Sequence, residues 1–172
     1  MKFRIVWLFL MATICSIQGC VNDNDPKGPL LTVGDHLPQF SVEMSDGLKI
    51  STADFIGKAG VIVFFNTNCS DCREELPVIQ QLWEEFKNNP DILIIPIARE
   101  EKKDEIETYW KENNLSMPFS PQDNKDIYNL FAPSVIPRIF ITDREGIIIF
   151  SSGDSDMPGF SQLKNIIESI LS

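Results

Sequence analysis

Two cysteines between a buried strand and an amphipathic helix constrain this chain more than any other feature. Cys69 and Cys72 follow a continuous apolar run over residues 61–65, and apolar residues then recur at helical spacing between residues 76 and 86. The first pattern predicts a strand covered on both faces, and the second predicts a helix. We therefore expect both thiols at a strand-to-helix turn, where unpaired backbone N–H groups and the positive end of the helix dipole lie.

This position favours redox chemistry of the two thiols. The N-terminus of a helix favours thiolate over thiol, and lowers the pKa of a cysteine from about 8.5 toward about 7 or below. A thiolate is the attacking species in disulfide exchange, and a second thiol nearby can resolve the mixed disulfide. We expect Cys69, nearer the loop, to be the exposed nucleophile and Cys72, inside the first helical turn, to be the resolving thiol.

Two other interpretations of the cysteine pair are weaker. A permanent disulfide between Cys69 and Cys72 would close a very small loop and would constrain the unfolded chain little. Half of a Cu(I) or Zn(II) site is the second alternative, but the other cysteines lie within the first 20 residues and the single histidine, His36, lies in a distant segment. We therefore expect no metal, and no cofactor besides the redox-active pair itself.

Hydrophobic periodicity outlines the rest of an α/β domain. The Asp46-Gly47 dipeptide predicts the turn of a β-hairpin, and Pro96 predicts a strand that lies at a sheet edge or stops there. The element order β-β-β-α-β-α-α-β-β-α predicts a mixed β-sheet flanked by helices on both faces. The expected strands cover residues 40–44, 48–51, 61–65, 92–97, 139–142 and 147–150, and helical spacing extends over residues 76–86, 102–112, 127–131 and 160–171.

The charge balance excludes some partners. The 172 residues carry 15 Lys+Arg against 25 Asp+Glu, which gives a formal net charge of −10. A surface of this sign repels phosphate backbones and anionic lipids. This argues against nucleic-acid binding and against membrane docking through a basic patch.

The amino terminus has the pattern of an export signal. Lys2 and Arg4 precede an apolar run that is too short to span a bilayer. Residues 17–20, Ile-Gln-Gly-Cys, resemble the lipobox of bacterial lipoproteins, in which the peptide is cut before a lipid-bearing cysteine. We expect a signal peptide over residues 1–19 and lipid attachment at Cys20; an ordinary secretory signal is the alternative.

The segment after Cys20 is polar and rich in structure-breaking residues, which predicts a flexible tether over residues 20–35 before a folded domain over residues 36–172. Its acidic residues are similar to the surface-export signals of some Bacteroidetes lipoproteins. We therefore expect an exported protein, lipid-anchored to a bacterial membrane and facing the periplasm, with surface exposure as the alternative.

The cysteine segment resembles that of a known family. Residues 57–77 look like the active-site segment of membrane-anchored, thioredoxin-like thiol-disulfide oxidoreductases of the TlpA/ResA type, and residues 136–146 are similar to the cis-proline strand and following hairpin of that family. The resemblance extends over about residues 30–172. It implies a thioredoxin-like fold with a central mixed sheet, helices on both faces and an added N-terminal β-hairpin.

The resemblance also implies roles for residues outside the cysteine pair. Pro137 would be the cis-proline beside Cys69, and the backbone of Ile136 would then hydrogen-bond a substrate peptide in the manner of a strand. Glu75 matches a glutamate that ResA-type proteins keep near their cysteines, where it could modulate a thiol pKa or shuttle a proton. Favourable interaction with the helix dipole is the alternative explanation for Glu75.

Two positions depart from the family pattern, and a third departs from thioredoxin itself. Asn68, assigned with Ile136 to substrate binding, stands where a tryptophan usually precedes the first cysteine. Asp71 places a negative charge beside the thiols, which should oppose thiolate formation. Val63 occupies the place of the buried aspartate of thioredoxin itself, so that proton acceptor is missing here, as it is in ResA-like relatives.

The resemblance implies an extracytoplasmic thiol-disulfide oxidoreductase that works in the reducing direction. Its partners would be disulfide-bearing client proteins and a membrane thiol donor that re-reduces the pair. A peroxiredoxin-like antioxidant is one alternative, although Ile62 and Asn66 stand where a Pro-x-x-x-Thr-x-x-Cys loop would need proline and threonine. A metal-binding or adaptor lipoprotein is the other alternative.

Overall fold

The computed structural model describes residues 30–172, so the predictions for the signal peptide, for Cys20 and for most of the tether concern residues outside this range. The chain is hydrogen-bonded to the folded domain from Leu31 onward, because the Leu31 N–H donates to the Phe131 carbonyl (2.9 Å) and the Gly34 N–H donates to the Ile148 carbonyl (2.8 Å). Within the described residues no helix combines the length and apolar character needed to cross a membrane.

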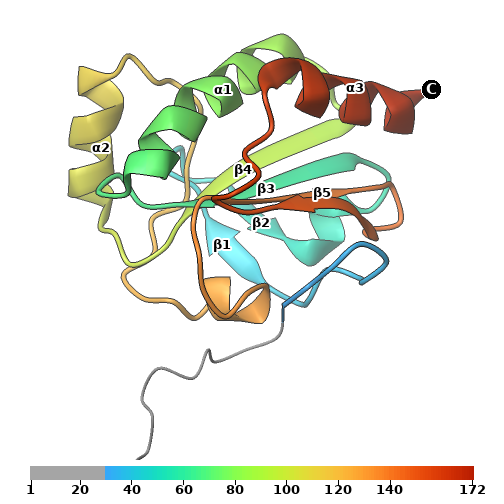
Figure 1. Ribbon diagram of the computed structural model, residues 1–172, viewed down its shortest axis with the longest axis horizontal. Coiled ribbons are helices and arrows are strands. Elements are labelled where there is room, and N and C mark those ends of the chain that lie inside the picture. Colours follow the sequence, from blue (N-terminus) through green and yellow to red (C-terminus); the bar gives the residue numbers. More distant parts are fainter. Residues whose placement is uncertain (1–29) are drawn as a thin grey trace, which may run out of the picture.

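A four-stranded mixed sheet in the order β4-β3-β5-β6 forms the centre of the domain (Figure 1). The central strand β3 (Ala59–Phe65) is parallel to β4 (Ile92–Ala98) and antiparallel to β5 (Arg138–Thr142), which pairs with β6 (Ile148–Ser152). Every residue of β3 is buried, as its continuous apolar run predicts. The predicted α/β class and mixed sheet are confirmed.

The three α-helices contribute to one hydrophobic core on one face of the sheet. Helices α1 (Ser70–Phe86) and α3 (Phe160–Leu171) lie across this face, and α2 (Lys103–Glu112) adds Trp110 to the same core near the end of β3 (Figure 1). Because side chains alternate along a strand, β3 presents Val63 to these helices and Phe64 to the opposite face.

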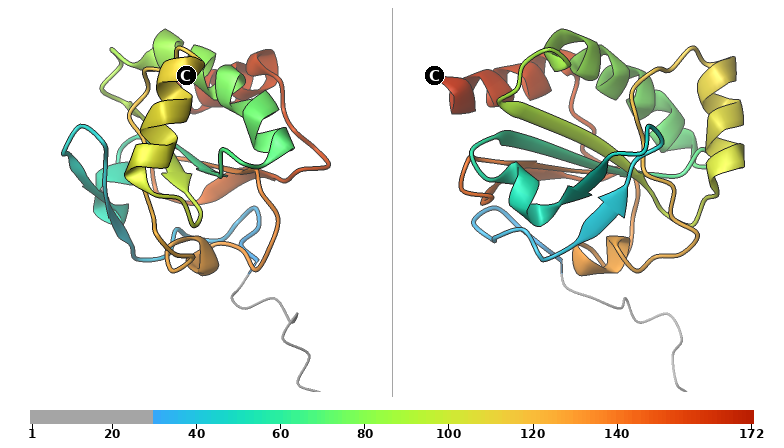
Figure 2. Two further views of the ribbon diagram at one scale, coloured as in Figure 1. Left: turned by 90° about the vertical axis from the view of Figure 1, so that its left-hand side faces the viewer. Right: turned by 180° about the vertical axis from the view of Figure 1, so that it is seen from behind.

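The opposite face is covered by the N-terminal hairpin and two short 3-10 helices (Figure 2). The hairpin pairs β1 (Ser41–Glu43) with β2 (Lys49–Ser51) as a separate two-stranded sheet. The 3-10 helices are η1 (Thr52–Phe55), which hydrophobic spacing did not predict, and η2 (Tyr128–Leu130), which takes the place of the predicted helix over residues 127–131. Helical segments therefore flank both faces, but the α-helices occupy only one of them.

Strand β4 lies at the edge of the sheet, as Pro96 predicts, but it does not stop at the proline. Pro96 pairs with Val63 in the parallel register, and the strand continues to Ala98. The Ser120 N–H donates to the Pro96 carbonyl from outside the sheet (2.8 Å). Since the nitrogen and carbonyl of one strand residue face the same side, the missing N–H of Pro96 faces this outer loop and not β3.

Gly60 lets η1 pack closely against β3. A Cβ atom at this position would lie 2.3 Å from a ring carbon of Phe55 and 2.5 Å from the hydroxyl oxygen of Thr142. Both distances are shorter than van der Waals contact, so a larger residue would displace the buried Phe55 ring.

Candidate active site

The two cysteines lie where β3 passes into α1. Cys69 is the N-cap residue of α1, with extended backbone angles (φ −86°, ψ 127°), and Cys72 lies in the first helical turn. The side chain of Cys69 is partly exposed, whereas that of Cys72 is completely buried. The structure therefore places the thiols as predicted, with one accessible sulfur and one sulfur behind it.

The loop before β5 lies against the Cys69 sulfur. The Ile136–Pro137 bond is cis, as the resemblance implied, and the Cys69 thiol donates to the Ile136 carbonyl at 3.5 Å. The two segments meet because Arg138, the first residue of β5, pairs with Phe64 near the end of β3 in the antiparallel register. A peptide carbonyl 67 residues further along the chain thus becomes a neighbour of the accessible sulfur.

Burial dominates the pKa of the Cys72 thiol and outweighs the backbone hydrogen bond at Asn66, which acts in the opposite direction. The pKa of the Cys72 thiol is raised well above its ordinary value, chiefly because burial disfavours the charged thiolate. The nearby charge of Asp71 acts in the same direction, as predicted. The expectation of a lowered pKa is therefore wrong for Cys72, which remains a thiol at neutral pH until a base removes its proton.

Glu75 lies one helical turn after Cys72 and is only 3% exposed. Its Oε1 atom has no hydrogen-bond partner among the described residues, and burial raises the pKa of its carboxyl to about 7. The preceding acid, Glu74, is exposed to solvent. Favourable interaction with the helix dipole can therefore explain Glu74, but it does not explain a buried and partly unpartnered carboxyl at Glu75.

We expect the buried Glu75 carboxyl to destabilise the folded state at high pH, and we expect Glu75→Gln to remove this effect. Because folding raises this pKa, the folded state binds more protons than the unfolded state between about pH 4.5 and about pH 7, and stability falls as the pH rises through this window. We expect Glu75→Gln to leave the free energy of unfolding nearly unchanged at pH 4 and to raise it by roughly 2–3 kcal/mol at pH 8.

Urea unfolding of wild type and variant at the two pH values measures this difference. Glu74→Gln is the matched control, because it removes an exposed carboxylate from the neighbouring position. An effect of Glu75→Gln that is equal at pH 4 and pH 8 would contradict a raised carboxyl pKa.

A residue that sequence reasoning missed holds the loop before Cys69. Glu101 is 1% exposed, and its carboxylate accepts hydrogen bonds from the Thr67 N–H (2.8 Å) and from the Thr67 hydroxyl. Asn66 adds to this support, because its side-chain amide donates to the Arg99 carbonyl (3.0 Å) and its backbone carbonyl accepts from the Cys69 N–H (3.0 Å). The loop that presents the nucleophile is thus tied to the segment after β4.

The parallel pairing of β3 and β4 explains why Glu101 reaches this loop. Neighbouring parallel strands end at the same edge of a sheet, so residues just after β4 lie beside residues just after β3. Two consecutive acids, Glu100 and Glu101, directly after a predicted buried strand are the signal that could have identified this support.

Asn68 is exposed next to Cys69, and its N–H donates to the Asn66 side-chain oxygen (2.9 Å). It lines a shallow groove of about 410 Å³ between the cysteine loop and α2. Ile136 is partly buried and Pro137 is buried. Because the Ile136 carbonyl contacts the Cys69 thiol and Asn68 directly precedes Cys69, all three predicted residues lie near this sulfur. Residues 30–172 contain no cluster of three or more His, Cys, Asp or Glu side chains suited to hold a metal ion.

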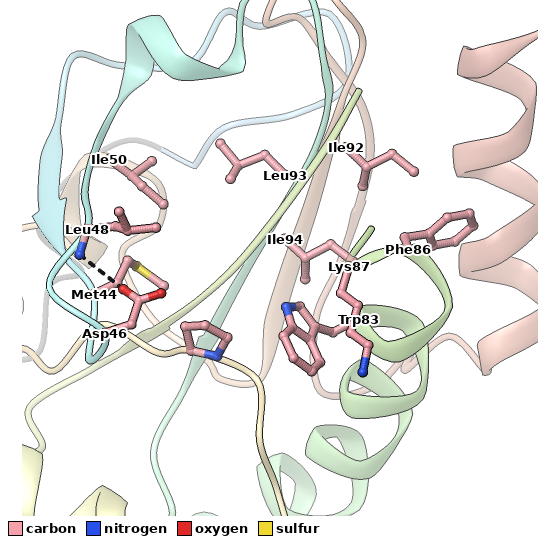
Figure 3. Close-up of a pocket in the computed structure, with 11 residues that line it drawn as sticks. Met44, Asp46, Leu48, Ile50, Trp83, Phe86, Lys87, Ile92, Leu93 and Ile94 are labelled. Carbon is pink, nitrogen blue, oxygen red and sulfur yellow. Dashed lines mark hydrogen bonds between the residues drawn. The ribbon is translucent and has the colours of Figure 1, made fainter. Parts of the chain in front are cut away.

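A second hollow, of about 230 Å³, lies away from the cysteines (Figure 3). Trp83 and Lys87 line it from the C-terminal end of α1, and Leu48 lines it from the hairpin. Its walls are apolar except for Asp46 and Lys87. Because Cys69 caps the other end of α1, this hollow does not form part of the cysteine site.

The fold and the asymmetric thiol pair define the class of protein, a thioredoxin-like thiol-disulfide oxidoreductase. Comparison with known families places it further: the chain belongs to the AhpC/TSA family, whose profile matches residues 33–151. The resemblance to TlpA/ResA-type proteins that the sequence showed is confirmed by the individual relatives.

One such relative is the thiol-disulfide oxidoreductase ResA of Bacillus cereus, which is 26% identical over 150 residues, or 86% of this chain and 84% of ResA. A solution structure of a candidate protein disulfide isomerase from Bacteroides thetaiotaomicron superposes with a TM-score of 0.78 at 26% identity, over 86% of this chain and 94% of the other. A secreted thiol-disulfide isomerase from Corynebacterium glutamicum shares the fold (TM-score 0.67, 16% identity, 87% and 94% coverage).

Proposed function

We propose that the chain is an extracytoplasmic reductase that transfers electrons from the Cys69–Cys72 dithiol to disulfides in client proteins. The observation that carries this proposal is the asymmetry of the pair: Cys69 is partly exposed and contacts the Ile136 carbonyl, while Cys72 is buried in the first turn of α1. An accessible sulfur beside the Ile136 backbone suits a protein substrate, because a client backbone can pair with Ile136 while its disulfide meets Cys69.

The exchange proceeds in two displacements. The Cys69 thiolate attacks one sulfur of the client disulfide, so that a mixed disulfide forms and the other client sulfur leaves as a thiolate. Cys72 then loses its proton and attacks the Cys69 sulfur, which forms the Cys69–Cys72 disulfide and releases the second client thiolate. Two electrons pass from the pair to the client, and the departing thiolates take up protons.

Glu75 supplies the base for the second displacement. The raised pKa of Cys72 means that its proton must be removed before it can attack, and a carboxyl with a pKa of about 7 is matched to that transfer near neutral pH. Glu75 lies one turn along the same helix and has an oxygen that no other described group engages. Glu75 then passes the proton of Cys72 to the departing client thiolate and returns to the carboxylate form.

The environment of Cys72 supports the reducing direction. A strongly oxidising pair owes its high potential to a stabilised thiolate in the reduced form. Here, burial and the charge of Asp71 both disfavour a thiolate at Cys72. The dithiol form therefore lacks this stabilisation on its resolving sulfur, and the pair should give up its electrons readily.

Equilibration of the purified domain with glutathione buffers tests the direction. We expect the pair to be mainly disulfide at about −240 mV, near the glutathione couple, and to need a stronger reductant such as dithiothreitol to reach half reduction. Alkylation of free thiols followed by mass measurement gives the fraction reduced. A pair that stays mainly dithiol in the glutathione buffer would identify an oxidant and overturn the reductase assignment.

The amino-terminal sequence supports an exported, lipid-anchored location. The basic start, the short apolar run and the Ile-Gln-Gly-Cys segment ending at Cys20 are the features that support a folded domain held outside the cytoplasm on a tether. A membrane thiol donor would then re-reduce the Cys69–Cys72 disulfide after each turnover. Loss of membrane association in a Cys20→Ser variant, measured by cell fractionation, checks the anchor; continued association would refute it.

A further inference from the structure

Val135 has a backbone conformation that β-branched residues rarely adopt. Its φ angle is +76°, in the left-handed region, and it directly precedes the Ile136 carbonyl that contacts the Cys69 thiol. Such a conformation costs free energy and persists only where surrounding groups hold it. The group that holds Val135 therefore also influences where the Ile136 carbonyl lies.

Tyr128 is that group. Its hydroxyl donates a 2.6 Å hydrogen bond to the Val135 carbonyl. The residue belongs to η2, seven positions earlier in the chain, so the bond closes the segment that leads into β5. A short hydrogen bond from a buried hydroxyl fixes the carbonyl in both distance and direction.

The Tyr128 ring is itself held on two sides. It is 1% exposed and packs edge-on against Phe64 of β3, with 5.2 Å between ring centroids. The guanidinium of Arg99, just after β4, lies over the ring at 4.8 Å from its centroid. The ring that carries the hydroxyl is thus held by β3 and by the residue just after β4. The Cys69 loop follows β3 and is tied to the segment after β4.

We propose that Tyr128 is a positioning residue for disulfide exchange, because its hydroxyl, acting through Val135, holds the Ile136 backbone in the place where it contacts Cys69 and pairs with a client. This inference rests on the proposed function, in which a client strand binds at Ile136. Tyr128 does not touch the reacting sulfurs, so its effect should appear in reactions that use the Ile136 backbone and not in those that only require a free thiol.

Two substrates separate these cases for a Tyr128→Phe variant. A peptide disulfide pairs with the Ile136 backbone, whereas iodoacetamide alkylates Cys69 without pairing. We expect Tyr128→Phe to slow exchange with the peptide disulfide about tenfold, because a small misplacement of a binding group has a large effect on rate. Alkylation in a Cys72→Ser background should change by less than about twofold.

Thr52→Val is the matched control. Thr52 is also buried on this face of the sheet, and its hydroxyl donates a 2.6 Å hydrogen bond to the Pro38 carbonyl, but neither residue belongs to the cysteine site. The variant loses this bond and also leaves the Phe40 N–H, which donates to the Thr52 hydroxyl (2.9 Å), without its acceptor. It therefore loses at least as much hydrogen bonding as Tyr128→Phe, while the wild-type exchange rate should be kept. An equal slowing by both variants, or equal slowing of exchange and alkylation by Tyr128→Phe, would overturn the proposal.

Amide hydrogen exchange gives a readout that does not depend on the function. Tyr128→Phe should speed exchange of the backbone amides in residues 135–139 at least fivefold relative to Thr52→Val, and unchanged protection there would refute positioning by Tyr128. If the wild-type protein fails to react with peptide disulfides but this local effect is seen, the proposed function fails while the structural role of Tyr128 stands.

Discussion

A Cys69→Ser variant is expected to lose disulfide exchange by at least a factor of about 1,000. A serine hydroxyl stays protonated at neutral pH and is a poor nucleophile without an activating base, whereas a thiol supplies thiolate. The buried Cys72 cannot substitute, because its side chain is completely enclosed and its pKa is raised. Reduction of a fluorogenic peptide disulfide by the pre-reduced proteins measures the loss.

Cys72→Ser has a different expected outcome, which distinguishes the two thiols. The first displacement can still occur at Cys69, but nothing resolves the product, so mixed disulfides with clients should accumulate. These adducts are detected on non-reducing gels and disappear with dithiothreitol. Equal activity of the two serine variants, or adducts trapped through Cys72 in the Cys69→Ser protein, would contradict the assignment of nucleophile and resolving thiol.

Glu101→Ala is expected to cause the largest loss of stability among the loop substitutions. It leaves the N–H and the hydroxyl of Thr67 without their charged acceptor in a buried place. With about 1.5–3 kcal/mol for each of the two hydrogen bonds to the charged group, we expect the free energy of unfolding to fall by about 3–6 kcal/mol. Freed from this contact, the loop should present Cys69 less well, and exchange should slow about 100-fold.

Glu101→Gln is the control for this prediction. The amide oxygen can still accept from the Thr67 N–H, so the loss should be about 1–2 kcal/mol. Guanidinium unfolding monitored by tryptophan fluorescence compares the variants. If Glu101→Ala and Glu101→Gln are equally stable, the carboxylate does not hold the loop. The exposed neighbour Glu100, which pairs with Lys125 at 2.9 Å, should tolerate the same alanine change with little effect.

Most of the regular elements could be predicted because each depends on a local pattern. The all-apolar run of β3, the helical spacing of α1 and the turn at Asp46-Gly47 each identify an element without its neighbours. The two 3-10 helices were harder to predict, since three or four residues are too few to show a period. Their position on the sheet face opposite the α-helices depends on tertiary packing, which the spacing of apolar residues does not reveal.

Some features of the candidate active site could also be predicted from the sequence, and others could not. The thiols could be assigned because their order along a strand-to-helix turn determines which is nearer the loop. The raised pKa of Cys72 could not, because it follows from burial of this side chain in the core that the helices form with the sheet. Glu101 and Tyr128 escaped prediction because each acts on a loop that another part of the chain provides.

The order of residues along the chain by itself determined the reacting groups of this protein, two thiols separated by two residues at a helix start, which is a spacing that allows one thiol to resolve a mixed disulfide formed at the other. Only the tertiary structure decided which groups surround them: the carbonyl of Ile136 beside Cys69, the carboxylate of Glu101 under the loop, and the hydroxyl of Tyr128 behind Val135. These contacts join residues brought together by sheet register and core packing, and both are properties of the folded chain as a whole.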